Sequence, residues 1–330
     1  MLCTSCGKRP AQYFRRSSGE RLCLNCLFAS IEERVWRTIR EEKMIEPGDK
    51  VAIAISGGKD SLVLLDVLGR LKKRLRDVEL EAFTINEGHP YSCFYRMSRA
   101  DFVRELAEKY GVPYFVFTFK EVFGFTALEV AERIWKRGEH VHMCTIDGVL
   151  RRRAMNLIGK KRGWTKIATA HNLDDEAQTV MLNVLMGNIK RFAWYAAEDS
   201  EEKDLIKRIK PLKKVREEEI AIYAYYRGIP LMELECPYVY DNPRYGLKFL
   251  LAELEGDMPN VKYNLASFGE RLAELVRVEE GYRRCKYCGA VTARDVCRVC
   301  ELFEKAGLLK EYLEKARELG YLQPNATTLV

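Results

Sequence analysis

The sequence has no hydrophobic run long enough to cross a membrane, and its first residues do not resemble a secretory signal. No segment approaches the ~18 consecutive apolar residues of a membrane-spanning helix, and Met1 to Cys6 contain neither a basic nor an apolar stretch. Low-complexity tracts are missing too. Glutamine occurs only three times beside abundant Lys, Glu and Arg, which hints at a thermophilic source. These absences predict a cytoplasmic globular protein that does not bind membranes.

The charge balance is positive, and the basic residues are clustered. The 330 residues carry a formal net charge of +7 and are 47% hydrophobic, which is ample material for a buried core. Basic runs occur at 151–153, 160–162 and 213–214. Each run is compatible with a solvated helix face, but three of them near candidate active-site segments favour a nucleic-acid partner.

Eight of the eleven cysteines form two sets of paired Cys-x-x-Cys motifs. Two residues between cysteines allow both sulfurs to reach one ion, and four thiolates complete a closed tetrahedral shell. A closed shell suits structural Zn²⁺, which contributes on the order of 10 kcal/mol to the folding of short segments. The two predicted zinc sites are Cys3, Cys6, Cys23 and Cys26 near one end, and Cys285, Cys288, Cys297 and Cys300 near the other.

A buried strand, a glycine-rich turn and a helix are predicted in succession at residues 51–71. The apolar run 51–55 is β-branched at alternate positions, and leucines recur with helical spacing from Leu62. Between them lies Ser56-Gly57-Gly58-Lys59-Asp60-Ser61. Such a turn presents backbone N–H groups and the positive end of a helix to phosphate. The alternative is an ordinary strand-to-helix turn that binds no ligand.

The same alternation continues downstream. Strands are predicted at 80–85, 114–119 and 166–170, with helices at 97–110 and 174–186. This order predicts an α/β fold with a doubly wound parallel sheet, whose ligands bind at the carboxyl ends of the strands. Other predicted elements are helices at 31–44, 217–227 and 260–280 and an edge strand at 231–234.

Two segments together resemble a known family. The sequence at 56–61 is similar to the pyrophosphate-binding loop of the PP-loop ATP pyrophosphatases, which cleave ATP to AMP and pyrophosphate. The segment Ala170-His171-Asn172-Leu173-Asp174-Asp175-Glu176-Ala177 resembles a second signature of the PP-loop enzymes that modify tRNA. With cysteine motifs at both ends, the chain is similar to the tRNA 2-thiolation family over essentially its whole length.

The resemblance implies an ATP site and a role for several residues. Lys59, Asp60, Arg151 and Asp175 are the expected catalytic residues. Asp60 or Asp175 would hold Mg²⁺, and Arg151 would stabilise charge on the α-phosphate. Asp174 and Asp175 are also compatible with capping of the helix that they begin. The expected ATP-binding residues are Ala54, Ser56, Gly57, Gly58, Lys59, Asp60, Ser61, Ile85, Arg151, Ala170 and Asp175.

In the resembling family, three further cysteines hold an iron–sulfur cluster. Here Cys144 and Cys236 match two of these positions, but Asp147 stands where the family pattern has the third cysteine. A carboxylate is a harder ligand than a thiolate and holds such a cluster less tightly. Three interpretations stay open: a functional site of two cysteines and one aspartate, an impaired site, or no cluster. A bound cluster would be [4Fe-4S], with one iron that lacks a protein thiolate.

The resemblance implies ATP-dependent 2-thiolation of tRNA. Adenylation turns the C2 oxygen of uridine into a leaving group, which a sulfur nucleophile displaces. The expected nucleoside is 5-methyluridine at T-loop position 54, and uridine 34 or cytidine 32 are the alternatives. Expected partners are tRNA, a ubiquitin-like carrier protein with a C-terminal thiocarboxylate, and a second copy of the chain in a homodimer.

Two other functions use the same residues. One is adenylation of a small acceptor by the same fold, and the other is a zinc-dependent RNA-binding scaffold with a vestigial ATP site. The predicted organisation places an N-terminal zinc finger at 1–30, a linker helix at 31–48, the PP-loop catalytic domain at 49–280, and a C-terminal zinc finger and tail at 281–330.

Overall fold

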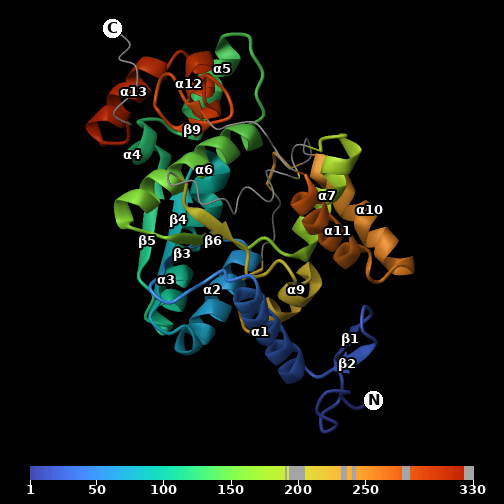
Figure 1. The fold of residues 1–330 in the computed structure, drawn as a ribbon. Helices are drawn as coiled ribbons and strands as arrows, with labels where there is room; N and C mark the ends of the chain where they lie inside the picture. The colour runs from blue at the N-terminus through green and yellow to red at the C-terminus, as the bar shows by residue number, and fades with distance from the viewer. Residues whose placement is uncertain (190–191, 193–204, 232–235, 240–242, 277–282, 323–330) are drawn as a thin grey trace.

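The computed structural model describes residues 1–189, 192, 205–231, 236–239, 243–276 and 283–322. A central parallel sheet lies between two layers of helices, and the first and last described residues lie at opposite corners of the molecule (Figure 1). The predicted α/β fold with a doubly wound parallel sheet is therefore confirmed. The edge strand predicted at 231–234 falls largely outside the described residues.

The central sheet has five strands in the order β5-β4-β3-β6-β7, and every neighbouring pair is parallel. Its first four strands match the predicted ones, whereas the fifth was not predicted. The chain order changes direction between β3 and β6, which is where ligands bind in open sheets of this kind. The strands are β3 (Lys50–Ala54), β4 (Glu79–Asn86), β5 (Tyr114–Thr118), β6 (Lys166–Ala168) and β7 (Lys207–Ile209).

Alternate residues of the strands point to opposite faces, and each face has its own core. In β3, Val51 and Ile53 enter one core cluster, while Ala52 between them enters the other. Neighbouring β4 divides in the same way, with Leu80 on the first face and Phe83 on the second. A strand buried on both sides explains why the run at 51–55 is apolar throughout rather than alternating.

The first face is covered by helices from both halves of the chain. Its buried cluster contains apolar residues of four helices, named below, and of the N-terminal cysteine segment. Leu27, Ile31 and Val35 form a buried stripe along the helix that leads from that segment to the sheet. The helices of this face are α1 (Leu24–Glu41), α2 (Lys59–Leu71), which ends in the short turn η1 (Lys72–Arg74), α3 (Ala100–Lys109) and α9 (Glu217–Tyr226).

The N-terminal segment is held to this face by a buried carboxylate as well as by apolar contacts. It forms a small hairpin of β1 (Tyr13–Arg15) and β2 (Glu20–Leu22). Glu219 on α9 is fully buried and accepts from Arg15 Nε at 2.7 Å and from Arg34 Nη1 at 2.6 Å. The helix α1 begins at Leu24, between two of the predicted zinc ligands, and not at residue 31 as predicted.

The second face is covered by helices that precede β6 and by the C-terminal segment. Phe123, Phe303 and Tyr312 meet in an aromatic cluster, with the rings of Phe303 and Tyr312 stacked at 4.4 Å. The long helix α6 crosses this face of the sheet (Figure 1). The elements are α4 (Phe119–Phe123), α5 (Ala127–Lys136), α6 (Met143–Arg162), β8 (Arg283–Arg284), β9 (Val291–Thr292), α12 (Arg298–Ala306) and α13 (Leu309–Glu318).

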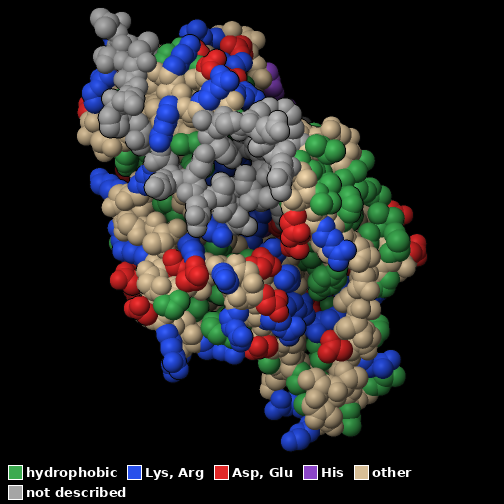
Figure 2. Space-filling view, viewed as in Figure 1, with side chains coloured by type: hydrophobic (Ala, Val, Ile, Leu, Met, Phe, Trp, Pro, Cys, Tyr) green, Lys and Arg blue, Asp and Glu red, His purple; other side chains and the backbone are tan. Residues whose placement is uncertain are grey.

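Three helices form a separate unit beside the sheet. They are α7 (Leu173–Leu185), which follows β6, α10 (Pro243–Asp257) and α11 (Val261–Leu275), and both later helices pack on α7 (Figure 1). The side chains of Phe249, Phe268 and Leu275 are exposed on this unit, where apolar surface gathers in Figure 2. No helix among the described residues is long and apolar enough to cross a membrane.

Candidate functional site

The glycine-rich turn between β3 and α2 is held in shape by its own two hydroxyl groups. Ser61 Oγ donates to the carbonyl of Gly58 at 2.8 Å and accepts from the backbone N–H of Ser56 at 3.1 Å. Gly57 has a φ of +81°, a conformation that favours glycine. A Cβ at this residue would also lie 3.4 Å from the backbone of Arg96. The turn therefore needs both its serines and its first glycine to keep its shape.

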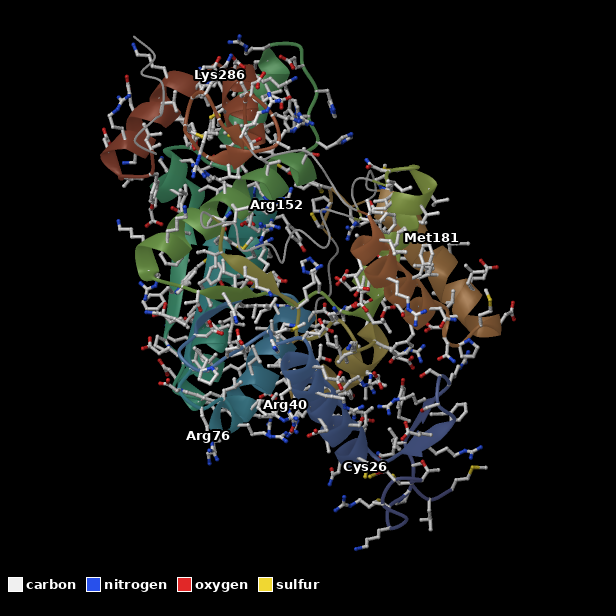
Figure 3. The ribbon with its side chains drawn as sticks, viewed as in Figure 1. Cys26, Arg40, Arg76, Arg152, Met181 and Lys286 are labelled. Carbon is white, nitrogen blue, oxygen red and sulfur yellow. The ribbon has the colours of Figure 1, made fainter. Side chains whose placement is uncertain are left out.

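A cavity of about 760 Å³ opens beside this turn, at the carboxyl ends of β3, β4 and β6. It lies at the change of strand order, between α6 and the α7 unit. Arg152 on α6 and Met181 on α7 mark these two sides in Figure 3. Eight of the eleven expected ATP-binding residues line the cavity: Ala54, Ser56, Asp60, Ser61, Ile85, Arg151, Ala170 and Asp175. The structure thus brings together most of a site that the sequence distributes over 122 positions, from 54 to 175.

Lys59, Gly57 and Gly58 are the expected ATP ligands that do not line the cavity. The Nζ atom of Lys59 lies 2.8 Å from Glu217 at the start of α9 and 3.1 Å from Asp60. Burial alone would lower the pKa of Lys59, but these two carboxylates raise it overall. Lys59 is therefore charged at neutral pH, at the edge of the cavity rather than in it.

The two expected metal-binding carboxylates lie on facing helix starts. Asn172 connects them, because its Nδ2 donates to Asp60 at 3.1 Å and its backbone N–H donates to Asp175 at 3.0 Å. Asp175 thus also caps α7, whereas Asp174 is turned away towards Lys262. Burial raises the pKa of Asp60 and of Asp175, and their mutual repulsion raises that of Asp60 further. A divalent cation between them would relieve this repulsion.

A buried glutamate that the sequence analysis missed fixes the position of Arg151. Glu87 is fully buried at the end of β4 and accepts from Arg151 at 2.7 Å and from Arg96 at 3.1 Å. Two guanidinium groups on one carboxylate leave a net positive charge, and both arginines line the cavity. This wall of the cavity is therefore built to receive an anion. Glu87 lies two residues after the end of the strand predicted at 80–85, and this position was the available signal for it.

A second set of basic residues lines the opposite wall of the cavity. Arg208 and Lys210 come from the edge strand β7 and the residue after it, and Arg244 lies in the first turn of α10. Arg244 donates to Thr179 Oγ1 at 2.9 Å, and Lys210 lies 3.2 Å from Glu176. None of the three was predicted. The strand β7 has only three residues and shows no alternation of polar and apolar side chains, and the helix α10 was not predicted either.

Cys144, Asp147 and Cys236 lie next to the cavity and near one another. Cys144 and Asp147 occupy the first turns of α6, and the Sγ atom of Cys144 lies 3.5 Å from the carbonyl oxygen of Tyr238, two residues after Cys236. Burial raises the pKa of both thiols, and the charge of Asp147 raises each further. Asp147 is buried, Cys236 is half-buried and Cys144 is exposed, and a cationic group bound between them would favour the thiolate forms of the two cysteines.

The Asp147 carboxylate supplies the clearest sign that this group fits a metal cluster. Asp147 is only 8% exposed, and its Oδ1 atom is buried and has no hydrogen-bond partner among the described residues. A buried carboxylate oxygen without a partner is costly. The ligand atoms of the three residues do not all lie within 4.8 Å of one another, as single-ion ligands would. The donor set is thus compatible with a cluster of several irons rather than with one ion.

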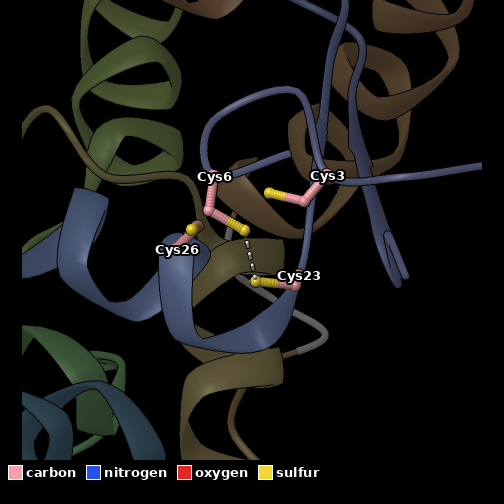
Figure 4. Close-up of side chains that lie close together, drawn as sticks. All are labelled: Cys3, Cys6, Cys23 and Cys26. Carbon is pink, nitrogen blue, oxygen red and sulfur yellow. Dashed lines mark hydrogen bonds between the residues drawn. The ribbon is translucent and has the colours of Figure 1, made fainter. Parts of the chain in front are cut away.

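The eight remaining predicted ligands form two tight groups at opposite ends of the molecule. Figure 4 shows the N-terminal four converging, with Sγ of Cys6 and Cys23 4.0 Å apart. In the C-terminal group, Sγ of Cys288 and Cys297 are 3.6 Å apart. Within each group, all four sulfurs lie within 4.8 Å of one another. Four thiols at this separation fit the closed tetrahedral shell of Zn²⁺. Zinc binding at both groups stays a prediction.

One residue of the basic run 151–153 contacts the C-terminal cysteine group. Arg153 does not line the cavity, and its Nη2 atom lies 4.0 Å from the Sγ of Cys288. The run was predicted to favour a nucleic-acid partner, and this contact of Arg153 was not predicted. Residues two apart on a helix face nearly opposite directions, so Arg151 and Arg153 serve different sites. Arg152 remains exposed and lines the cavity.

Comparisons with known proteins agree with these features. The PP-loop domain family matches residues 29–236. The chain is 36% identical to the tRNA 2-thiolation protein NcsA of Haloferax volcanii, over 92% of this chain and 98% of that protein. It is 33% identical to the cytoplasmic tRNA 2-thiolation protein 1 of Chlamydomonas reinhardtii, over 92% and 84%. Its fold matches the U34-tRNA thiolase NcsA of Methanococcus maripaludis, solved with its [4Fe-4S] cluster, with a TM-score of 0.79 and 31% identity over 92% and 96% of the two chains.

Proposed function

This chain belongs to the PP-loop family of tRNA 2-thiolation proteins, and we propose that it is an ATP-dependent tRNA sulfurtransferase. The observation that carries this proposal is the position of Arg151. Its guanidinium lines the nucleotide-sized cavity, and Arg151 follows Cys144 and Asp147 at the spacing that puts all three on one side of α6. A residue shared by an anion-binding cavity and a group of thiols suits a reaction that joins nucleotide and sulfur chemistry at one substrate atom.

The cavity residues carry the activation step. The hydroxyl groups of Ser56 and Ser61, which line the cavity, and the positive end of α2 bind the pyrophosphate of ATP. Arg151, held by Glu87, stabilises negative charge on the α-phosphate as the uridine C2 oxygen attacks it. The P–O bond to pyrophosphate breaks, and AMP remains attached to the C2 oxygen. Asp60 and Asp175 are the residues that would hold Mg²⁺, which would supply positive charge to the phosphates. Lys59 leaves Glu217 to neutralise the departing pyrophosphate.

The thiol group carries the transfer step. Cys144, Cys236 and Asp147 are the residues that would hold a [4Fe-4S] cluster, whose remaining iron would supply a Lewis acid for hydrosulfide. Sulfur attacks C2 of the adenylated uridine, and AMP leaves with the former C2 oxygen. Arg151 and Arg96 line the wall on which the departing phosphate lies.

The target nucleoside that we favour is the wobble uridine at position 34. The relative from Methanococcus maripaludis is described as a U34-tRNA thiolase. The sequence analysis favoured 5-methyluridine 54 and gave uridine 34 as an alternative, so the comparison supports that alternative. The ubiquitin-like sulfur carrier and the homodimer stay predictions. The exposed apolar residues of α10 and α11 are the candidate surface for a second copy.

The test measures pyrophosphate release from ATP and the nucleosides of the product tRNA. The reconstituted protein should release pyrophosphate only with tRNA and Mg²⁺ present, and mass spectrometry should detect 2-thiouridine at position 34. Lys59→Ala should reduce release at least 100-fold while leaving the circular dichroism spectrum unchanged. Lys73→Ala is the matched control, because Lys73 is exposed just after the same helix.

Three results would contradict parts of this proposal. Pyrophosphate release without any tRNA would point to adenylation of a small acceptor. No ATP cleavage under any condition would support the RNA-binding scaffold. Thiolated 5-methyluridine in place of thiolated uridine 34 would keep the chemistry but restore the first choice of nucleoside.

A further inference from the structure

A buried histidine contacts the group formed by Cys144, Asp147 and Cys236. His89 lies in the turn after β4 and is only 2% exposed. Its Nε2 atom lies 3.1 Å from Oδ2 of Asp147. Its ring also packs edge-on against Tyr238 at 5.8 Å, in the segment that follows Cys236. His89 therefore touches both chain segments that supply the thiols and the carboxylate.

The hydrogen bonds of His89 define where its proton lies. The backbone N–H of Ser92 donates to Nδ1 at 3.2 Å, so Nδ1 is an acceptor and carries no proton. In the neutral ring the proton is then on Nε2, which donates to Oδ2 of Asp147. One oxygen of the carboxylate is thus occupied, while the other, Oδ1, is buried with no partner among the described residues.

The turn that carries His89 is stiff. Asn86 Oδ1 accepts from the backbone N–H of Gly88 at 2.9 Å and from Ser92 Oγ at 3.2 Å, and Ser92 is itself fully buried. Gly88 has a φ of +78°, and a Cβ there would lie 2.6 Å from Cβ of Thr126. The backbone of the turn therefore has little freedom, and the imidazole is fixed relative to α6.

We infer that His89 is a positioning residue that turns the Asp147 carboxylate into a one-oxygen ligand for iron. A cysteine at this position would offer a single donor atom, whereas a carboxylate offers two and can rotate. The Nε2–H group holds Oδ2 and leaves Oδ1, which has no hydrogen-bond partner among the described residues, as the oxygen that would ligate iron. The inference rests on the iron–sulfur part of the proposed function, and its test uses neither ATP nor tRNA.

The test measures iron and acid-labile sulfide per chain after anaerobic reconstitution, and the rate at which a chelator removes the iron. The wild-type protein should retain iron and give the electron paramagnetic resonance signal of a reduced cluster. His89→Ala should lose iron 10- to 100-fold faster, the range typical for removal of such a partner. His89→Gln, whose amide N–H reaches a similar position, should restore much of the retention. His140→Ala is the matched control, because His140 is exposed just before α6, the helix that carries Cys144 and Asp147.

A double substitution separates orientation from general damage. In an Asp147→Cys background the ligand is a single sulfur atom, and there is no carboxylate for His89 to orient. Adding His89→Ala should therefore change the rate of iron loss less than threefold. Equal losses in both backgrounds, unchanged retention in His89→Ala, or a wild-type chain that binds no iron would each overturn the inference. Failure of the proposed function appears separately, as iron-loaded protein that neither cleaves ATP nor thiolates tRNA.

Discussion

Removal of the Arg153 charge should weaken metal binding at the C-terminal cysteine group and leave the N-terminal group unchanged. The substitution is Arg153→Met, which keeps the length of the side chain without its charge. Four thiolates on one Zn²⁺ ion carry a net charge of −2, or about half a charge for each sulfur. The Nη2 atom of Arg153 lies 4.0 Å from the sulfur of Cys288 in this group.

The distance gives the size of the effect. Two unit charges 4 Å apart interact by about 4 kcal/mol at an effective dielectric constant of 20. With half a charge on the sulfur, the Arg153–Cys288 interaction is worth about 2 kcal/mol. Since 1.4 kcal/mol corresponds to a factor of ten, the affinity of the C-terminal group for zinc should fall about 30-fold.

Zinc release to a chromogenic chelator measures this difference. The wild-type protein should release zinc in two phases, and a Cys3→Ser, Cys6→Ser double variant identifies the N-terminal phase. Arg153→Met should accelerate only the other phase. Arg298→Met is the control, because Arg298 lies between two of the ligands but pairs with Glu301 on the surface. Equal release from Arg153→Met and wild type would refute the electrostatic reasoning.

Two further predictions concern acid stability and RNA binding. Burial alone would raise the pKa of Glu81, but hydrogen bonds from Arg162 and Trp164 contribute to lowering it to about 2. Since the pKa in the unfolded chain is near 4.5, this carboxylate stabilises the fold above that pH by about 3 kcal/mol. Glu81→Gln should therefore lower the unfolding free energy at pH 7, and its difference from wild type should shrink as the pH falls from about 4.5 towards 2 in urea titrations. Arg152→Glu should weaken tRNA binding and reduce its salt dependence by about one ion per lost phosphate contact, whereas Lys73→Glu should have a smaller effect; an unchanged salt slope would place the tRNA elsewhere.

The fold was predictable where local sequence and tertiary burial agree. The strand at 51–55 is apolar, and the strand at 80–85 is mostly so, because both of their faces are buried. The turn at 56–61 was predictable from its residues, because a glycine such as Gly57 is what a positive φ before a helix favours. The edge strand β7 escaped prediction because three residues at the margin of a sheet bury little and carry no periodicity.

The site residues that belong to a sequence motif were predictable, whereas those that depend on contacts between segments far apart in the sequence were not. Most of the expected ATP ligands line one cavity because they follow neighbouring parallel strands. Glu87 and His89 have no motif, and their roles depend on α6, a helix some 60 residues later in the chain. The contact of Arg153 with Cys288 was not predicted, because a basic run in a sequence does not show which side of a helix each of its residues faces.

The helix α6 has a mechanical consequence. One of its sides carries Asp147 and Arg151, and the other meets the cysteine group of the C-terminal finger through Arg153. A helix is stiff over such a span, so a rotation imposed on one side is imposed on the other. Oxidation of the C-terminal cysteine group would therefore displace the cavity residues of α6 without contacting them.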